Sequence, residues 1–256
     1  MDVRFDGKVA VVTGASEGIG YATAERFGLD GASVAVCGRS ESKLAAAATK
    51  LEQQGINVYS KPTDVADPLQ FETFMDGAAA AFGGIDILIN NAGIAQGASI
   101  ADMSIEDWDK VLDTNLRSTF VGGKLALKYM KDSGGVIANA SSFATIIPSV
   151  GTAAYAASKA AIASLTRVMA SEFAPFGIRV FGYIPGFIDT PMNAPNKAAQ
   201  PEKMLAPIAL RRYGESEDIA NVIVFMCSPW ASYVTGNCVE ISGGKFATQY
   251  PEFAWK

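Results

Sequence analysis

The stretch Val9-Ala10-Val11-Val12-Thr13-Gly14-Ala15-Ser16-Glu17-Gly18-Ile19-Gly20 decides how this chain folds. Its first five residues are a short apolar run of the kind that forms a buried strand. Three glycines follow in the spacing GxxxGxG, and glycine lets the backbone turn sharply and pass close to a bound group. The segment predicts a strand, a tight loop and a helix whose N-terminus can hold a dinucleotide pyrophosphate. A glycine cluster alone is also compatible with an ordinary strand-to-helix turn.

Short apolar runs continue along the chain and alternate with longer helical segments. The runs predicted as strands are residues 9–13, 34–37, 56–59, 85–89, 136–140, 178–184 and 238–241. Alanine-rich segments between them, such as 41–54 and 156–174, predict helices. Glycines mark four helix ends, at Gly31, Gly55, Gly83 and Gly134. We therefore predict one α/β domain over residues 1–256, a Rossmann-like, doubly wound, seven-stranded parallel sheet with helices on both faces.

Charge and composition exclude several classes of function. The chain has 21 lysines and arginines against 26 acidic residues, a net charge of −5, and no basic run, which argues against a nucleic-acid partner. It has no histidine, so Ser-His-Asp and Cys-His nucleophiles and histidine-ligated metal sites are excluded, and we predict no metal. Proton transfer has to use tyrosine, lysine, a carboxyl group or cysteine.

The cysteines and the N-terminal residues predict a cytoplasmic protein. Cys37, Cys227 and Cys238 form no CxxC pair and leave an odd thiol under any pairing, as expected in a reduced compartment. The first six residues include two aspartates, Asp2 and Asp6, where a signal peptide needs a basic start. Residues 133–158 carry no charge, but their Asn, Ser and Pro residues are too polar for a membrane, so no membrane association is predicted.

A tyrosine and a lysine four residues apart form the most reactive pair in the sequence. In Tyr155-Ala156-Ala157-Ser158-Lys159 both side chains lie on one helix face. An ammonium about 4 Å away, at an effective dielectric near 20, favours the phenolate by around 4 kcal/mol, or roughly three pKa units. We therefore predict that Lys159 brings the pKa of Tyr155 near the working pH for acid/base catalysis. The alternative is a structural pair on a helix surface.

Together with the motifs around it, this pair resembles the short-chain dehydrogenase/reductase family in its compact form. The similarity extends from about residue 7 to residue 244 and rests on TGxxxGxG, Asn90-Asn91-Ala92-Gly93, a mid-helix Asn115, Ser142 before YxxxK, a Pro-Gly pair and a terminal Gly-Gly. It implies hydride transfer between NAD(P) and a carbonyl or CH-OH carbon. The implied catalytic residues are Asn115, Ser142, Tyr155 and Lys159.

Each of these residues has an expected role. Ser142 would hold the substrate oxygen, and Lys159 would also bind the ribose hydroxyls. The resemblance implies that Asn115 interrupts its helix and holds a water that relays protons toward Lys159. Asp64 and Val65 are expected to bracket the adenine. The residues expected to bind the cofactor are Gly14, Ser16, Glu17, Gly18, Ile19, Gly20, Arg39, Asp64, Val65, Asn91, Ala92, Gly93, Tyr155, Lys159, Pro185, Gly186, Ile188 and Thr190, with the Ile188 backbone and the Thr190 hydroxyl on the nicotinamide carboxamide.

Cofactor choice depends on the end of the second predicted strand. Gly38 stands where an aspartate would accept the adenosine-ribose hydroxyls of NAD. Arg39 suits a 2′-phosphate, because a guanidinium matches phosphate with two parallel hydrogen bonds. Against this, the Glu17 carboxylate would repel that phosphate, and Arg39 could instead stack on the adenine. We predict NADP(H), with NAD(H) as the alternative.

The positions expected to face the substrate are mostly apolar, and none carries a positive charge: Ile94, Ala95, Gln96, Phe143, Thr145, Ile146, Phe187, Met192, Met204 and Leu205. They predict a neutral, hydrophobic, cyclic ketone or secondary alcohol as the small-molecule substrate. Residues 189–210 show no clear period and are predicted as the substrate loop. Two alternatives stay open. A 3-oxoacyl-[acyl-carrier-protein] reductase shares every catalytic motif, and a non-catalytic dinucleotide sensor is expected to lose Tyr155 or Lys159.

The C-terminal tail, residues 245–256, follows the last family motif yet carries four aromatic residues: Phe246, Tyr250, Phe253 and Trp255. Exposed together in water they would promote association. Burying one large aromatic stabilises by roughly 2–3 kcal/mol. We therefore expect a docked tail at a contact within a homo-oligomer, a tetramer or dimer, close to the substrate mouth. The alternative is a frayed chain end.

Overall fold

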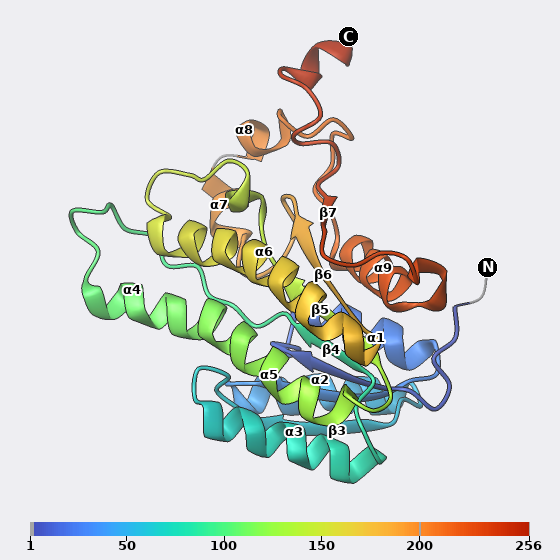
Figure 1. The fold of residues 1–256 in the computed structure, drawn as a ribbon. Helices are drawn as coiled ribbons and strands as arrows, with labels where there is room; N and C mark the ends of the chain where they lie inside the picture. Colours follow the sequence, from blue (N-terminus) through green and yellow to red (C-terminus); the bar gives the residue numbers. More distant parts are fainter. Residues whose placement is uncertain (1–2, 200, 256) are drawn as a thin grey trace.

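The computed structural model describes residues 3–199 and 201–255 and contains one seven-stranded sheet (Figure 1). The strand order is β3-β2-β1-β4-β5-β6-β7, and every neighbouring pair is parallel. The strands are β1 Val9–Thr13, β2 Ser33–Gly38, β3 Val58–Pro62, β4 Ile87–Asn90, β5 Gly135–Ala140, β6 Ile178–Pro185 and β7 Cys238–Ile241. The predicted fold class is confirmed.

The order reverses next to the first strand, which places the site. The chain moves from β1 outward to β3, then returns to the other side of β1 and continues from β4 to β7. Val12 pairs with Val36 of β2 on one side and with Ile89 of β4 on the other. In open α/β sheets ligands bind at such a reversal, beyond the carboxyl ends of the strands.

Helices cover both faces of the sheet (Figure 1). The longer ones are α1 Gly18–Leu29, α2 Glu41–Gln53, α3 Pro68–Phe82, α4 Ile105–Leu112, α5 Ser118–Met130, α6 Ala153–Phe173 and α9 Ser216–Cys227. Val12 packs in one core with Phe27 of α1, whereas its neighbour Val11 packs in the other with Phe74 of α3. Successive strand residues point to opposite faces, which is why the first four residues of β1 are all apolar.

Two predicted strands begin two residues too early. β3 begins at Val58 rather than at residue 56, and β4 spans Ile87–Asn90 rather than 85–89. Ile56 and Ile85 are only 6% and 3% exposed, but they are apolar because they pack in the approach to each strand, not because they join the ladder. The four predicted glycine helix ends all have a positive φ, as helix termination by glycine requires: Gly31, Gly55, Gly83 and Gly134.

Residues 189–210, predicted without regular structure, contain two short helices, α7 Ala194–Ala199 and α8 Pro201–Leu205. They and the C-terminal tail lie beyond the end of the sheet, at the top of Figure 1. None of the helices in the described part of the chain is long and apolar enough to cross a membrane. Within residues 3–199 and 201–255 there is also no cluster of acidic or cysteine side chains able to hold a metal ion.

Candidate active site

The glycine loop between β1 and α1 is built for close approach. Gly14 and Gly18 have φ values of +66° and +59°, in the left-handed region that favours glycine. A Cβ on Gly20 would lie 2.3 Å from the Gly14 carbonyl oxygen, so no larger residue fits there unshifted. A Cβ on Gly18 would meet nothing closer than the Thr190 methyl at 3.4 Å. Helix α1 begins at Gly18 without a side-chain cap, which leaves its first N–H groups for an anion. These residues fit a dinucleotide.

Asn91 braces this loop from the end of β4. Its Nδ2 donates to the Thr13 carbonyl at 3.0 Å and the Gly14 carbonyl at 3.2 Å, and its Oδ1 accepts from the Tyr183 hydroxyl at 3.1 Å. The N–H groups of Asn91 and Ala92 both donate to the Thr13 hydroxyl at 3.0 Å. The side chain of Asn91, a predicted cofactor residue, therefore forms hydrogen bonds that hold the two strand ends together.

Asn115 lies where the helix is interrupted, as the resemblance implied. Residues Asp113–Arg117 form a π-helical turn between α4 and α5. The Asn115 side chain is fully buried; its Oδ1 accepts from the Ile94 N–H at 2.8 Å, and its Nδ2 donates to the Ile94 carbonyl at 3.0 Å and to Ser158 Oγ at 3.1 Å. Asn115 thus ties the segment after β4 to α6, which carries the tyrosine and the lysine.

Lys159 is a buried cation. Only 4% of it is exposed, and its Nζ donates to the Ala140 carbonyl, at the end of β5, at 2.8 Å. The Nζ lies 5.7 Å from the centroid of the Tyr155 ring. No carboxylate among the described residues pairs with it, and burial lowers the pKa of Lys159 to about 8.

The protonation of Tyr155 differs from the prediction. Burial raises the pKa of Tyr155 above its usual value, while a contact with the Ser142 hydroxyl acts in the opposite direction. The expectation that Lys159 brings this pKa near neutral is wrong for this structure, because loss of hydration is the largest effect on the pKa and the Nζ lies over the ring, 5.7 Å from its centroid. Tyr155 is therefore protonated at neutral pH, the form that can donate a proton.

The buried ammonium makes stability depend on pH. Between about pH 8 and 10.5 the folded chain has released the Lys159 proton that the unfolded chain still binds, so stability rises with pH through this range. Between pH 8 and 10.5 we expect the unfolding free energy of the wild type to increase by about 3 kcal/mol relative to that of Lys159→Met. This increase corresponds to about 1.4 kcal/mol per pH unit. Urea unfolding of both proteins between pH 7 and 10.5 measures this, and a difference that stays flat with pH would contradict it.

Ser142 begins the loop after β5. It is 4% exposed, and its Oγ accepts from the Ala144 N–H at 3.2 Å at the start of a short 3₁₀ turn, Phe143–Thr145. Its neighbour Ser141 donates to the Lys159 carbonyl at 3.1 Å, so the loop is tied directly to α6. The structure thus brings Ser142, Tyr155 and Lys159 to one corner, with Asn115 one hydrogen bond away through Ser158.

The segment after β6 crosses to the glycine loop. A Cβ on Gly186 would lie 2.6 Å from Ser242 Cα, so this glycine allows the Pro185-Gly186 turn to pass under the end of β7. Ile188 forms a bridge with Gly214, and its carbonyl accepts from Asn193 Nδ2 at 2.9 Å. Thr190 faces Gly18 across the crevice, where the nicotinamide half of a dinucleotide would follow the pyrophosphate.

One charged residue close to the positions predicted to select the cofactor was missed by the sequence reasoning. Glu17 forms an ion pair with Lys43, on the first turn of α2, at 2.9 Å. Arg39 is exposed nearby, at the end of β2. The repulsion expected from Glu17 is therefore neutralised. The sequence does contain a signal for the position of Lys43. Ser40 caps α2 by accepting from the Lys43 N–H, which places Lys43 in the first turn of that helix.

The two adenine residues play different parts. The Asp64 carboxylate accepts from the Ala66 N–H at 3.0 Å and shapes the turn after β3. Val65 is 5% exposed and packs in the core beside Phe71. The structure thus places Asp64 near the strand ends, whereas much of the Val65 side chain is used in packing.

The substrate side contains a cation that the sequence reasoning also missed. Lys245 Nζ lies 4.9 Å from the Phe143 ring centroid and 6.0 Å from that of Phe187. Phe246 packs on Phe143, with ring centroids 6.3 Å apart, so the start of the tail does contact the predicted substrate mouth. The positions that the sequence predicts to face the substrate do not include Lys245, which lies beyond the last motif and is brought to Phe143 and Phe187 only by the fold.

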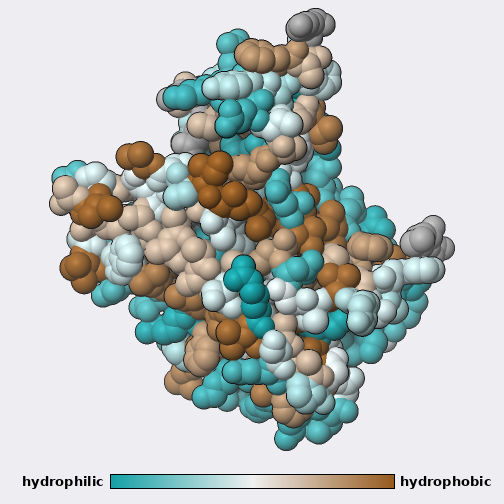
Figure 2. All heavy atoms as spheres, turned by 45° about the horizontal axis from the view of Figure 1, so that its top comes forward, coloured by the Kyte–Doolittle hydropathy of each residue, from teal (hydrophilic) through white to brown (hydrophobic). Residues whose placement is uncertain are grey.

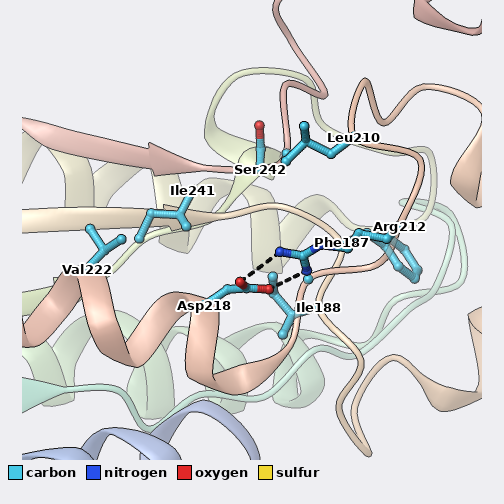
Figure 3. Close-up of a pocket in the computed structure, with 10 residues that line it drawn as sticks. Phe187, Ile188, Leu210, Arg212, Asp218, Val222, Ile241 and Ser242 are labelled. Carbon is cyan, nitrogen blue, oxygen red and sulfur yellow. Dashed lines mark hydrogen bonds and ion pairs between the residues drawn. The ribbon is translucent and has the colours of Figure 1, made fainter.

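The surface around this mouth is apolar. Figure 2 shows hydrophobic side chains gathered where the projecting part of the molecule meets its body. A cavity of about 230 Å³ lies beside it, lined in part by Phe187, Ile188 and Ser242 (Figure 3). Arg212 and Asp218 are joined there by hydrogen bonds of 2.6 and 2.9 Å, which fasten the loop after α8 to α9.

Within residues 245–255 the tail contacts the body of the molecule at its start and through one indole. Trp255 Nε1 donates to the Ala209 carbonyl at 3.0 Å, and Tyr250 stacks on Phe253 with ring centroids 5.5 Å apart. These three side chains are nevertheless 61–67% exposed in the single chain. Their exposure leaves an apolar surface at the projecting end of the molecule.

Known proteins resemble the chain over nearly its whole length. A family model described as short chain dehydrogenase matches residues 8–201. The 3-oxoacyl-[acyl-carrier-protein] reductase FabG of Thermotoga maritima is 39% identical over 94% of this chain and 99% of its own length. The 3beta-hydroxysteroid dehydrogenase 1 of Eggerthella lenta is 40% identical over 96% of each chain.

Solved structures agree with these relatives. A putative short-chain alcohol dehydrogenase from Sinorhizobium meliloti 1021 superposes with a TM-score of 0.93 at 35% identity, covering 97% of this chain and 100% of that one. A short chain dehydrogenase from Burkholderia cenocepacia J2315, in complex with NADP, gives a TM-score of 0.90 at 36% identity, covering 94% and 99%. The shared fold and the reactive corner point to the same class of chemistry.

Proposed function

The chain belongs to the short-chain dehydrogenase family, and we propose on that premise that it reduces a hydrophobic, cyclic ketone with NADPH or oxidises the matching secondary alcohol. The observation that carries the proposal is the corner where Ser142, Tyr155 and Lys159 meet, beside the rings of Phe143 and Phe187. The sequence also predicts a neutral ketone, and the Lys245 ammonium beside Phe143 and Phe187 argues against a neutral substrate.

The chain's own residues account for the proton in this reaction. The bound nicotinamide supplies or accepts a hydride. The Ser142 hydroxyl holds the substrate oxygen, and the Tyr155 hydroxyl donates its proton to that oxygen as negative charge develops there. The Lys159 ammonium beside the ring stabilises the phenolate that remains. Asn115 acts at a distance, by holding Ile94 and Ser158 in place.

The preference for NADPH is supported by charge at the end of β2. Arg39 and Lys43 supply two cations, only one of which is paired with Glu17, and Gly38 offers no carboxylate for the adenosine ribose. The Burkholderia cenocepacia structure, itself a complex with NADP, is compatible with this preference.

Removing the guanidinium tests that preference. Arg39→Ala is expected to raise the Michaelis constant for NADPH about tenfold or more, since one charge-assisted contact contributes about 1.5–3 kcal/mol, and to leave that for NADH nearly unchanged. Steady-state kinetics with both cofactors measure this. A wild-type enzyme that prefers NADH would contradict the assignment of Arg39 to the 2′-phosphate of NADPH.

Introducing a carboxylate is the converse test. A Cβ on Gly38 would lie 2.3 Å from Ser16 Oγ, a side-chain atom that can rotate away, and nothing else comes closer than 3.6 Å. Gly38→Asp is therefore expected to fold and to shift the ratio of kcat/KM values toward NADH. Unchanged cofactor preference in a folded variant would count against a ribose site at this strand end.

A second candidate function is 3-oxoacyl-[acyl-carrier-protein] reduction, which the printed name of the Thermotoga maritima relative favours. Acidic carrier proteins dock on basic surfaces, and the net charge of −5 speaks against it. Comparing kcat/KM on a cyclic ketone panel and on acetoacetyl thioesters tests the choice. Faster thioester reduction would favour the second candidate. A dinucleotide sensor is disfavoured because Tyr155 and Lys159 are both present in the buried corner.

Assembly and location are also proposed. Large apolar side chains are exposed along one side of the helical layer, at Ile105 of α4, Phe120 of α5 and Val168 of α6. Together with the exposed tail aromatics they support a homo-oligomer, a dimer or tetramer. Cys37 and Cys227 are buried and free, and burial raises the pKa of Cys37 to about 12, which suits inert thiols in the cytoplasm.

A further inference from the structure

Lys245 is held in place by the turn that ends β7. The Ser242 hydroxyl accepts from the Lys245 N–H at 3.1 Å and donates to the Glu240 carboxylate. Gly243 and Gly244 have φ values of +65° and +78°, which reverse the chain direction at the sheet edge. The backbone of Lys245 is therefore fixed, and its side chain reaches back over the strand ends.

The ammonium of Lys245 lies between two functional segments. Phe143, whose ring centroid is 4.9 Å from the Nζ, directly follows Ser142 in the chain. Phe187, at 6.0 Å, directly follows the Pro185-Gly186 turn, which is proposed to border the nicotinamide. A group bound by Lys245 would thus lie beside the rings of Phe143 and Phe187, on the substrate side of the corner that holds Ser142.

The charge of Lys245 is uncompensated. Within residues 3–199 and 201–255 no carboxylate lies within 4 Å of its Nζ. Lys197 offers a contrast in the same aromatic group. It lies 5.1 Å from the Tyr213 ring centroid but is paired with Asp189. Lys245 is half-buried, and burial lowers its pKa, so an anion arriving here would replace lost hydration.

We propose that Lys245 is a specificity-determining residue that binds a carboxylate carried by the ketone substrate, while Phe143 and Phe187 contact its hydrophobic frame. The inference rests on the proposed function and narrows its substrate class to cyclic keto acids and the matching hydroxy acids. Cation–π contacts hold the ammonium over the rings but leave its N–H donors available. A carboxylate is the simplest anionic group that a hydrophobic cyclic substrate can place next to Phe143 and Phe187.

The test uses one ketone skeleton with and without the charge. The probes are 3-oxocyclohexanecarboxylate and 3-oxocyclohexylacetate, each paired with its methyl ester. Wild-type enzyme is expected to prefer acid over ester by about 10- to 100-fold in kcat/KM, the range of one charge-assisted contact. Lys245→Met is expected to bring the acid-to-ester ratio within about threefold of one, and Lys245→Arg to retain most of the preference.

Two controls separate this contact from other effects. Lys50→Met removes the same charge from an exposed position in the last turn of α2 and is expected to keep the wild-type ratio. The Michaelis constant for NADPH, measured with an ester, is expected to stay within about twofold in Lys245→Met. A rise of tenfold in that constant would assign Lys245 to the cofactor and overturn the proposal.

The remaining outcomes separate failure of the Lys245 proposal from failure of the proposed function. Equal efficiency on acid and ester in the wild type, or an unchanged ratio in Lys245→Met, overturns the Lys245 proposal alone. Reduction of neither compound, nor of any other cyclic ketone, overturns both proposals. A parallel comparison of acetoacetyl-coenzyme A with acetoacetyl-N-acetylcysteamine covers the other source of negative charge. A Lys245-dependent preference confined to the coenzyme A thioester would show that the anion is a phosphate and overturn the carboxylate assignment.

Discussion

Tyr155→Phe is expected to lower turnover by about 10²-fold or more and to leave NADPH binding nearly intact, since one positioned acid contributes on this scale. The substitution removes only the hydroxyl that contacts Ser142 and keeps the ring under the Lys159 ammonium. Ketone reduction at saturating substrate and NADPH titration by fluorescence measure the two quantities separately.

The matched control is Tyr233→Phe, because Tyr233 is fully exposed on the surface. It is expected to keep wild-type turnover. Retention of more than a tenth of wild-type turnover by Tyr155→Phe would remove Tyr155 from the proton-transfer step. Loss of NADPH binding in that variant would instead point to a structural pair, the alternative that the sequence left open.

Gly20→Ala is expected to disable the cofactor loop. The new Cβ would lie 2.3 Å from the Gly14 carbonyl oxygen and 2.5 Å from Asn91 Nδ2, so the loop has to shift against its brace. Overpacking of this kind costs about 1–3 kcal/mol, which corresponds to roughly 5- to 150-fold in NADPH affinity if the cost falls on the binding-competent loop. Calorimetric titration measures the loss of NADPH affinity, and thermal unfolding measures the loss of stability.

Gly84→Ala serves as the control for this change. A Cβ there meets nothing within 4 Å and its φ is not in the left-handed region, so stability is expected to change by no more than about 0.5 kcal/mol. Wild-type affinity and stability in Gly20→Ala would show that the loop is looser than its contacts imply.

The parts of the fold that rest on local pattern could be predicted from the sequence. The runs that became β1 and β7 have their predicted bounds, since each is a short run rich in valine and isoleucine that lies between glycine-containing turns. The starts of β3 and β4 were misplaced because Ile56 and Ile85 are buried for a reason that pattern cannot reveal, their packing ahead of the ladder. Segment type follows from local chemistry, whereas segment boundaries also depend on tertiary neighbours.

The site divides in the same way. The order and spacing of Ser142, Tyr155 and Lys159 could be recognised because the chemistry needs those residue types at those positions. The direction of the Tyr155 pKa was missed, since burial is set by the whole fold. Lys43 and Lys245 were missed because each reaches the site from a segment outside the motifs, one from the first turn of α2 and one from beyond β7.

The central claim is hydride transfer from the cofactor to a cyclic ketone at the corner that holds Tyr155, and isotope labelling tests it most directly. Wild-type enzyme is incubated with a cyclic ketone and NADPH deuterated at the nicotinamide C4, and the product alcohol is analysed by mass spectrometry. We predict an alcohol with one deuterium at the carbinol carbon, formed at about a hundredth of this rate or less by Tyr155→Phe. An alcohol without deuterium, or no ketone-dependent consumption of NADPH by the wild type, would contradict the claim.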